Sequence, residues 1–497
     1  MIDKEYQEIN SYINSINSKI LGTKDDIYYI ANDTLTRNSF ATKILSSKED
    51  IPNTTLWFMI ISFIKYYLKA FLLFFIFIAK SVIYKIVRKK SKIDNQILID
   101  TYFVVDKVAN SQSYKDSYFI GIDTLLKKSE YTYLVKSFYG SVLNLKKFYR
   151  VIKVLNRSER NIISEFDFIN ILDMFKILIF ILLYPFKIKK VFSQNRGVKS
   201  VFDYSLIESL NGSDFKSYIR YITGKNIASQ YSFKKIISWC EYQNIDKAFY
   251  KAVNESGKNI TIYGCQFLVP YNSWLNFFIP KSEKSFNLTP TTVLTNGKYY
   301  LDFIELDKRV GVSLRYKHIF NKQNSFVKEE YILLLGSFIK SDTLRLIEFA
   351  KSSSLNANII LRLHPTQDFD MYKDEVDSSW ILSKDSTLNE DIAKSFMIIT
   401  NDATGTSLET VCSEKSTIVV ANRDKFYSIP LVEYGKGKIW DIAFNKNDIE
   451  KLYNTLLKYR EENMDEIKEI ASWYRDNFFV EPNEENIVKA FELEKSV

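Results

Sequence analysis

Short apolar runs alternate with helical patterns in the C-terminal half of the chain. Each run is continuously apolar over about five residues, which is typical of strands that are buried on both faces. Strands are predicted at residues 331–335, 359–363, 396–400 and 417–421, and helices at residues 342–351, 388–394 and 407–412. This alternation predicts a parallel sheet with crossover helices, so residues 326–475 are expected to form a Rossmann-like α/β domain.

The N-terminal half has a less regular pattern. Helical stretches are interspersed with short strand-like runs at residues 26–31, 118–122, 131–136, 236–239 and 260–263. We expect residues 1–325 to form a first domain, because 497 residues are too many for one hydrophobic core. Residues 476–497 are expected to form a C-terminal helix that can pack back across the cleft between the domains.

Two segments, near residues 56–90 and 173–191, are much more apolar than the rest of the chain. Neither contains an uncharged run longer than ten residues, whereas a spanning helix needs about 18–20. In a helical projection, Lys65, Lys69 and Lys80 fall on one side of the first segment, opposite large apolar side chains. The pattern favours amphipathic helices that lie in a membrane interface, with their lysines toward the headgroups. Buried core helices and a spanning pair are the alternatives.

The net charge of +9 is concentrated around these two segments. Residues 51–93 carry eight basic side chains and no acidic one, and residues 174–202 carry six basic side chains and no acidic one. A nucleic-acid-binding protein would more often spread its basic residues over a face of its folded domains. We therefore expect peripheral attachment to an anionic membrane surface, and no nucleic acid as a partner.

Histidine and cysteine are too rare for several common enzyme classes. His318 and His364 are the only histidines, so a Ser-His-Asp hydrolase or an HExxH protease has little to work with. The three cysteines have no CxxC spacing, and they support neither a zinc site nor a disulfide framework. The Asp368-Phe-Asp370 triplet has the form of a DxD metal motif without its sequence context, so no metal site is expected. His318 is expected to belong to the hinge between the domains.

Candidate ligand-binding residues follow the predicted strands. In an open parallel sheet, ligands bind beyond the carboxyl ends of the strands. Arg362, His364 and Pro365 lie at the end of the strand at 359–363, and alternation places Arg362 and His364 on the same side. Two potential cations aimed at one spot favour phosphate as the ligand.

A second group of candidates follows the strand at 396–400. Small hydroxyl residues and a glycine open a helix there: Thr404, Gly405, Thr406, Ser407 and Glu409. Such a turn offers backbone N–H groups and a favourable dipole to an anion, although Ser407 would serve equally well as a plain N-cap. Gly336 and Ser337 follow the first strand at the same edge. Together these residues predict a nucleotide-phosphate site.

The order of these motifs resembles that of GT-B glycosyltransferases that use cytidine-activated donors. His364-Pro365 after a strand, and a Ser/Thr-rich turn about 40 residues later, are similar to bacterial sialyltransferases and Kdo transferases of surface-polysaccharide synthesis. The upstream half is similar to bacterial capsule transferases at WCEYQNIDKA (239–248), IYGCQ (262–266), Pro280, Glu283, Val310-Gly311 and LRY (314–316). The resemblance covers roughly residues 160–425, and residues 1–150 are not placed by it.

The resemblance implies a GT-B fold, in which two Rossmann-like domains face a central cleft. The apolar segments add amphipathic membrane-associated helices to its N-terminal half. The implied co-substrate is a CMP-activated Kdo-like or sialic-like acid, with no other cofactor, and the implied acceptor is a lipid-linked or surface glycan. Arg362 and His364 would neutralise the leaving CMP phosphate without a metal ion, and Thr406 and Ser407 would complete that site. The expected location is the cytoplasmic face of the bacterial inner membrane.

The catalytic carboxylate does not follow from the resemblance, because the acidic-acidic-Gly motif of these sialyltransferases is absent here. Glu241 follows the strand-like run at 236–239, which would place it at the interdomain cleft, where a carboxylate can act as base or nucleophile. A surface salt bridge with Lys235 or Lys247 is the alternative. Glu165 is a second catalytic candidate.

Two other functions stay open at this point. A CDP-polyol phosphotransferase of the teichoic-acid type uses a similar His-Pro and hydroxyl-rich pair, and its acceptor is also a membrane lipid. A non-catalytic, membrane-peripheral scaffold of polysaccharide assembly is the third hypothesis.

Overall fold

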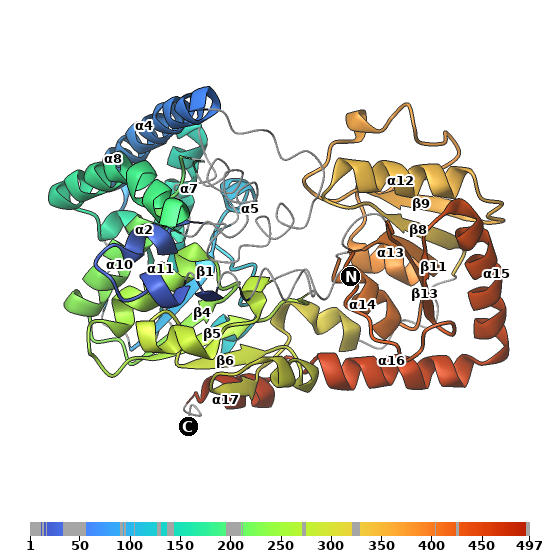
Figure 1. The fold of residues 1–497 in the computed structure, drawn as a ribbon. Coiled ribbons are helices and arrows are strands. Elements are labelled where there is room, and N and C mark those ends of the chain that lie inside the picture. The colour runs from blue at the N-terminus through green and yellow to red at the C-terminus, as the bar shows by residue number, and fades with distance from the viewer. Residues whose placement is uncertain are drawn as a thin grey trace.

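Two parallel sheets, each covered by helices, make up the protein (Figure 1). The structure is a computed structural model, and it describes residues 11, 14–15, 17–32, 56–89, 93, 96–103, 105–126, 131–136, 144–194, 210, 212–270, 275–320, 329–402, 404–423 and 427–493. Both sheets contain the strand order of the doubly wound nucleotide-binding fold. The predicted α/β architecture of two Rossmann-like domains in the GT-B arrangement is therefore confirmed.

The N-terminal domain is built on a seven-stranded parallel sheet with the order β3-β2-β1-β4-β5-β6-β7. Its strands are β1 (Ile97–Tyr102), β2 (Tyr131–Lys136), β3 (Ile162–Ser164), β4 (Lys235–Trp239), β5 (Thr261–Gln266), β6 (Thr292–Thr295) and β7 (Lys308–Val310). Its shorter helices include α2 (Asp26–Ile30), α5 (Val105–Ala109), α6 (Ile122–Leu125), α7 (Leu145–Arg157), α10 (Phe215–Gln230) and α11 (Asn244–Asn254). The chain reverses its direction of progress across the sheet between β1 and β4, so their carboxyl ends form the switch point at which such sheets bind ligands.

The C-terminal domain has a six-stranded parallel sheet with the order β10-β9-β8-β11-β12-β13, and its switch point lies between β8 and β11. Its strands are β8 (Tyr331–Leu335), β9 (Asn358–Arg362), β10 (Ile381–Leu382), β11 (Ser395–Asn401), β12 (Ser416–Val420) and β13 (Trp440–Ala443). Its helices are α12 (Lys340–Lys351), α13 (Leu388–Lys394), α14 (Thr406–Cys412), α15 (Lys446–Glu462) and α16 (Met464–Phe478). The four predicted strands and three predicted helices are all present, within two residues of their predicted bounds.

Two of the five strand-like runs predicted in the N-terminal half are not strands. Runs 131–136, 236–239 and 260–263 correspond to β2, β4 and β5. Residues 26–30 form helix α2 instead, because their aromatic residues pack sideways onto a neighbouring helix, with the ring of Tyr28 stacked 4.8 Å from that of Phe180. Residues 118–121 form bends and a turn ahead of α6.

The sequence pattern does not predict β1, although this strand is central to its sheet. Asp100 and Thr101 interrupt its apolar run. Both side chains are nevertheless fully buried. Asp100 is tolerated there because Nη2 of Arg220 lies 2.8 Å from its Oδ2. A buried ion pair between segments more than 100 residues apart leaves no local signal in the sequence.

An apolar seam joins the domains. It contains the 3-10 helix η5 (Leu314–Phe320), which connects the domains, together with α14 and α16. Its buried residues include Val269, Tyr300, Tyr316 and Ile319 from the N-terminal side and Leu408, Val411, Ile467, Ile470, Tyr474 and Phe478 from the C-terminal side. Helix α16 runs beneath the C-terminal domain toward the N-terminal domain, on which α17 (Glu484–Phe491) then packs, with the ring of Phe491 6.1 Å from that of Phe267 (Figure 1).

Two long apolar helices lie side by side on the outer face of the N-terminal domain (Figure 1). They are α4 (Leu56–Val87) and α8 (Ile171–Gln194), joined by hydrogen bonds from the hydroxyls of Tyr66 and Tyr67 to backbone carbonyls of α8. By length and composition, α4 is the one helix in the described ranges that is long and apolar enough to cross a membrane, and 33% of its most apolar window is buried against the protein.

Candidate functional site

The carboxyl ends of the two sheets face each other across the seam. A Cβ built on Gly405, which precedes α14, would lie only 3.1 Å from Cβ of Val269, which follows β5. His318 of η5 also reaches α14, where its Nε2 lies 2.8 Å from Oε2 of Glu409. The residues that follow the strands of both sheets therefore border one interdomain region, and His318 lies at the hinge.

Glu241 lies at the switch point of the N-terminal sheet, two residues after the end of β4. Its Oε1 accepts a hydrogen bond from the indole Nε1 of Trp239 (3.1 Å), and its Oε2 accepts one from Nε2 of Gln243 (2.6 Å). Burial raises the pKa of the Glu241 carboxyl above its ordinary value, and the hydrogen bond from Trp239 opposes this only in part. An oriented carboxylate with a raised pKa at a ligand-binding edge has the properties of a general base.

Neither lysine that was considered as a salt-bridge partner pairs with Glu241. Nζ of Lys247 lies 3.0 Å from Oε2 of Glu283, and Lys235 donates to the backbone at the end of α17. The next residue, Tyr242, has φ of +52°, a left-handed conformation that side chains other than glycine adopt at a cost. The strained loop turns the chain sharply after Glu241 and favours a functional carboxylate over a surface ion pair.

Four fully buried charges lie beside Glu241 in the centre of the sheet. Nζ of Lys136, at the end of β2, lies 2.7 Å from Oδ1 of Asp246 and 3.4 Å from Oδ2 of Asp100. Asp100 in turn binds Arg220, so two acidic and two basic groups are joined by ion pairs. Lys136 also donates to the carbonyl oxygen of Trp239 (2.6 Å) and thereby fixes the end of the strand that carries Glu241.

The pKa shifts of Asp100 and Lys136 keep these two groups charged. Burial alone would raise the pKa of the Asp100 carboxyl, but Arg220 and Lys136 outweigh it, and the pKa lies below its ordinary value. Burial likewise opposes the charge on Lys136, whereas Asp100 and Asp246 raise its pKa overall. Asp100 and Lys136 therefore remain charged over the neutral pH range.

Glu165, the second catalytic candidate, occupies a different position. It begins η1 (Glu165–Asp167), directly after the edge strand β3, and its side chain is fully buried. Its Oε1 lies 3.9 Å from Nη1 of Arg220. The structure does not bring Glu165 to the switch point, and its burial against a buried guanidinium favours a structural role.

His364 lies beyond β9, on the C-terminal side of the interdomain region. Its Nδ1 accepts a hydrogen bond from the backbone N–H of Thr366 (3.3 Å) and lies 2.7 Å from the Thr366 hydroxyl. Because Nδ1 is an acceptor, the proton of the neutral ring lies on Nε2. Burial lowers the pKa of His364, which favours this neutral form. Pro365 follows in a tight turn that fixes the backbone of His364. In its neutral form, His364 offers its Nε2–H as a hydrogen-bond donor and carries no positive charge.

Arg362 and His364 were expected to form a pair of cations available to a ligand. This expectation is wrong for Arg362, because its guanidinium is already ion-paired. Its Nη1 lies 2.8 Å from Oδ2 of Asp391 on α13, and it also donates to the hydroxyl of Ser383 (2.8 Å). Asp391 is 2% exposed, so its charge must be balanced and Arg362 balances it. Arg362 therefore holds the end of β9 against α13.

The hydroxyl residues between β11 and α14 lie at the predicted edge, but their hydroxyl groups have different surroundings. Thr404 and Thr406 are partly exposed, with their Oγ1 atoms 3.2 Å apart. Ser407 is 1% exposed and donates to the carbonyl oxygen of Thr404 (3.0 Å), so its hydroxyl is used within the turn. Gly405 is the N-cap residue, and the Glu409 carboxylate contacts the hinge. Because the Thr404 hydroxyl donates to that of Thr406, the Thr406 hydroxyl is the one in this group whose proton is available to a ligand.

The loop after β8 completes the C-terminal edge. Leu335 pairs with Thr400 on one side and with Arg362 on the other, so three loops leave the sheet in one row. The N–H of Gly336 donates to the carbonyl oxygen of Arg362 (2.9 Å), and the hydroxyl of Ser337 accepts a backbone hydrogen bond in the turn before α12. These two residues shape the edge through their backbone.

The Asp368–Asp370 triplet forms an exposed turn in which Oδ1 of Asp368 accepts a hydrogen bond from the N–H of Asp370 (3.2 Å). In the parts of the chain that the structure describes, no group of three or more His, Cys, Asp or Glu side chains is arranged to hold a metal ion. The three cysteines are buried free thiols.

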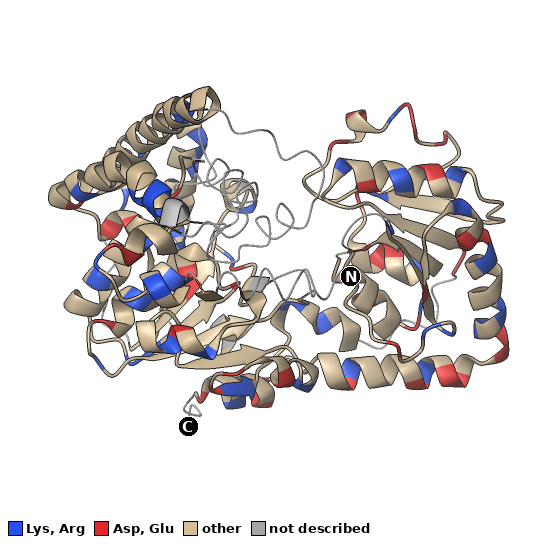
Figure 2. Cartoon of the chain, in the orientation of Figure 1, with Lys and Arg blue, Asp and Glu red and all other residues tan. Residues whose placement is uncertain are grey.

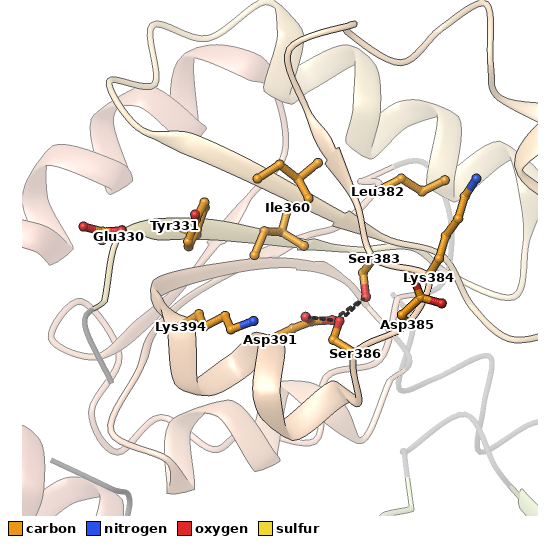
Figure 3. Close-up of a pocket in the computed structure, with 11 residues that line it drawn as sticks. Glu330, Tyr331, Ile360, Leu382, Ser383, Lys384, Asp385, Ser386, Asp391 and Lys394 are labelled. Atoms are coloured by element: carbon orange, nitrogen blue, oxygen red, sulfur yellow. Dashed lines mark hydrogen bonds between the residues drawn. The ribbon is translucent and has the colours of Figure 1, made fainter. Parts of the chain in front are cut away.

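A cavity of about 490 Å³ opens on the face of the C-terminal sheet beside α13 (Figure 3). Ser383 and Asp391 point toward each other at one end of it, where the hydroxyl donates to the carboxylate (2.6 Å). Glu330, which precedes the amino end of β8, lies at the other end (Figure 3). The cavity thus extends away from the carboxyl edge on which His364 lies.

Two residues at the N-terminal switch point were not among the candidates from the sequence. Tyr118 lies between α5 and α6, in the connection from β1 to β2, with its ring 4.8 Å from that of Trp239. The guanidinium carbon of Arg315, in η5, lies 5.3 Å from the Tyr118 ring and 5.6 Å from the Trp239 ring. Their place beside Glu241 depends on how β1, β4 and η5 meet, which the sequence pattern does not reveal.

No protein-family model matches the chain, and no curated protein matches it in sequence. Solved structures of similar fold include UDP-GlcNAc 2-epimerase from Neisseria meningitidis bound to UDP-GlcNAc, at 10% identity and a TM-score of 0.45, covering 80% of this chain and 100% of that one. MurG from Acinetobacter baumannii has 11% identity and a TM-score of 0.43 over 80% of this chain and 100% of that one. The wall teichoic acid polymerase TagF has 12% identity and a TM-score of 0.38 over 86% and 96%. These similarities concern the architecture of the chain and do not define its reaction.

The buried charge cluster gives a stability prediction. Lys136→Met removes one ammonium and leaves Asp246 and part of the charge of Asp100 buried without a partner, which costs about 3–5 kcal/mol. We expect a correspondingly lower urea midpoint, measured by tryptophan fluorescence. Lys107→Met, at an exposed lysine of the same domain, is the matched control and should change the free energy of unfolding by less than about 0.5 kcal/mol. Equal midpoints for the two variants would contradict the assigned role of Lys136.

Proposed function

We propose that the protein is a glycosyltransferase that moves a sugar from a nucleotide-activated donor to a glycan acceptor. The observation that carries this proposal is the position of Glu241 and His364 at the facing carboxyl ends of the two sheets. Glycosyl transfer needs a group that accepts the proton of the acceptor hydroxyl and a group that stabilises the leaving phosphate. Glu241 supplies the first and the Nε2–H of His364 the second.

In the proposed reaction, Glu241 takes a proton from the acceptor hydroxyl, whose oxygen attacks the anomeric carbon. The bond from that carbon to the phosphate oxygen breaks, and negative charge grows on the phosphate. The Nε2–H of His364 and the hydroxyl of Thr406 would donate hydrogen bonds to it, and the Thr404 hydroxyl, which donates to Thr406, would orient that hydroxyl. Preorganised donors of this kind are worth roughly 10²–10³-fold in rate each. Arg362 and Ser407 would act indirectly, by holding β9 and the turn before α14 in place.

The proposed donor is a CMP-linked Kdo-like or sialic-like acid, and the proposed acceptor is a lipid-linked or surface glycan. This choice rests on the motif resemblance over residues 160–425, since the geometry of the site fits any nucleotide phosphate. The alternative of a CDP-polyol phosphotransferase requires the same phosphate-binding edge. A non-catalytic scaffold, the other alternative, would not need a reactive carboxylate at Glu241.

A donor panel distinguishes these hypotheses. The protein is incubated with CMP-Kdo, CMP-sialic acid, CDP-glycerol and UDP-sugars, and nucleotide release is measured with a membrane-glycan acceptor. We expect release from a CMP-linked sugar acid, with His364→Ala lowering turnover roughly 10²-fold or more. Glu241→Gln should abolish transfer while CMP affinity stays within a few-fold, because the change is nearly isosteric.

Each other outcome of the panel has a defined meaning. Release of nucleotide from CDP-glycerol alone would mean that the protein is a phosphotransferase and not a glycosyltransferase. Release of nucleotide from none of the donors would support the scaffold hypothesis. Full transfer by Glu241→Gln would remove this residue from the reaction.

We further propose that α4 and α8 attach the protein to the cytoplasmic face of an anionic membrane without spanning it. Large apolar side chains on both helices, all 40–77% exposed, form what we term the apolar docking face: Leu56, Trp57, Ile60, Ile64, Leu68, Leu72, Phe75, Val82, Ile86, Ile171, Leu172, Phe175, Ile179, Leu182, Leu183 and Phe186. A soluble monomer rarely exposes a contiguous apolar surface of this kind, and such surfaces mark membrane or protein contacts. The basic residues along both helices favour an anionic membrane over a protein partner (Figure 2).

The placement of individual lysines refines the expectation from the sequence. Lys65 and Lys69 are exposed at the side of the apolar docking face, as expected. Lys80 is not on that side, because it is 1% exposed and lies over the ring of Phe148 at 5.6 Å. Lys85 donates to a backbone carbonyl ahead of α8 (2.7 Å) and so stabilises the helix pair. The opposite face of α4 packs on the protein through residues such as Tyr66, which supports attachment in the plane of the membrane.

Vesicle binding tests the membrane proposal. Replacing Leu68, Phe75 and Phe175 by Gln removes apolar contact, and replacing Lys65, Lys69, Lys189 and Lys190 by Glu reverses the exposed charge, at about 1 kcal/mol per basic residue. We expect either set to release the protein from anionic vesicles, while Phe303→Gln, at an exposed residue elsewhere, leaves binding unchanged. High salt should weaken binding without abolishing it, since screening acts on charge and not on apolar insertion. Retention of the charge-reversed protein through alkaline washing would mean that α4 spans the membrane.

A further inference from the structure

Arg315 lies in the segment that connects the two domains, close to Glu241. It belongs to η5, whose helical geometry is interrupted at Tyr316 (φ −111°, ψ 22°). The kink sends neighbouring side chains in different directions. Tyr316 packs into the interdomain seam, His318 contacts Glu409 of α14, and Arg315 extends over the rings of Tyr118 and Trp239. The guanidinium thus lies on the N-terminal side of the interdomain region.

Its surroundings hold Arg315 in place without neutralising it. The two aromatic rings lie 5.3 Å and 5.6 Å from the guanidinium carbon. Stacking on aromatic faces orients a guanidinium but leaves its N–H edges open for a planar, bidentate anion. Arg315 is exposed, and within the described ranges it has no ion pair or hydrogen bond to another residue. By contrast, the buried Arg220 of the same domain is paired with Asp100.

Glu241 and Arg315 both interact with the indole of Trp239. The Nε1–H of Trp239 donates to Glu241, while its ring carries the guanidinium. The positive charge of Arg315 is close enough to lower the pKa of Glu241, although burial still raises that pKa overall. A substrate that has both a reacting hydroxyl and an anionic group needs a carboxylate for the first and a cation for the second. Glu241 and Arg315 provide both beside the end of one strand.

We propose that Arg315 binds an anionic group, carboxylate or phosphate, of the substrate that is held beside Glu241. This inference rests on the proposed transfer reaction, and it assigns a binding role to a residue outside the phosphate edge of the C-terminal domain. The donor has such groups in the carboxylate of its sugar acid and in its phosphate, and a lipid-linked acceptor has one in its phosphate. The chemistry of recognition is the same for the three sources.

Binding measurements with Arg315→Gln identify the source. Calorimetry is done with CMP and with CMP-sialic acid, using Arg150→Gln, an exposed arginine on α7, as the control. Loss of a bidentate charged contact should weaken binding about 10- to 100-fold. Weaker binding of CMP-sialic acid alone identifies the sugar carboxylate, and equal weakening of both ligands identifies the donor phosphate. A raised KM for the acceptor with unchanged donor binding identifies the acceptor phosphate.

Two further readouts separate binding from a structural role. Arg315→Gln should move the acidic limb of the pH profile of kcat/KM to higher pH, because it removes a positive charge that lowers the pKa of Glu241. Arg315→Lys should restore most of that shift. Labelling of Arg315 by phenylglyoxal, followed by mass spectrometry, should be slowed by inorganic phosphate or pyruvate, whereas labelling of Arg150 should not.

The labelling experiment does not depend on turnover, so it decides the role of Arg315 even if no donor in the panel reacts and the proposed function fails. Unchanged ligand binding and acceptor KM in Arg315→Gln, together with labelling that neither anion slows, would overturn the inference.

Discussion

The packing of η5 against α14 and α16 is the constraint on which the interdomain site depends. The buried apolar seam includes Tyr316 and Ile319 of η5, and it fixes how the carboxyl ends of the two sheets face each other. The approach of Gly405 to Val269 is close, because a Cβ at residue 405 would lie 3.1 Å from Cβ of Val269, a tight contact. Because α17 then packs on the N-terminal domain, the chain connects its two halves twice. A base on one sheet and phosphate donors on the other can act on one substrate only while this seam holds.

At the switch point of the N-terminal sheet, the buried side chains include ion-paired charged groups. Replacing a buried ion pair by apolar residues is often neutral or stabilising, so the cluster around Lys136 is not explained by stability alone. Its geometry suggests what it provides: Lys136 binds the last carbonyl of β4, from which Glu241 and the strained Tyr242 follow. The rigid strand end orients the Trp239 indole, and the indole in turn positions both Glu241 and Arg315. The cluster therefore holds the polar groups Glu241 and Arg315 in defined positions at the switch point.

The sequence predicts those parts of the structure that depend on local pattern. The C-terminal strands are continuous apolar runs, so they and the loops that follow them could be located, and Glu241 could be found from the strand before it. Features that depend on distant partners could not be predicted. β1 contains Asp100, which only Arg220 makes tolerable, and Arg362 is engaged by Asp391 of a later helix. Arg315 lies in the LRY motif at residues 314–316, but that motif gave it no role, because its role comes from the meeting of three separate segments.

A crystal structure of the complex with CMP and an unreactive CMP-sugar analogue tests the central claim most directly. In this complex, we expect the phosphate to contact Nε2 of His364 and the hydroxyl of Thr406, and the sugar to point across the interdomain region toward Glu241. A nucleotide bound in the cavity beside Asp391, or a phosphate turned away from His364, would contradict that claim.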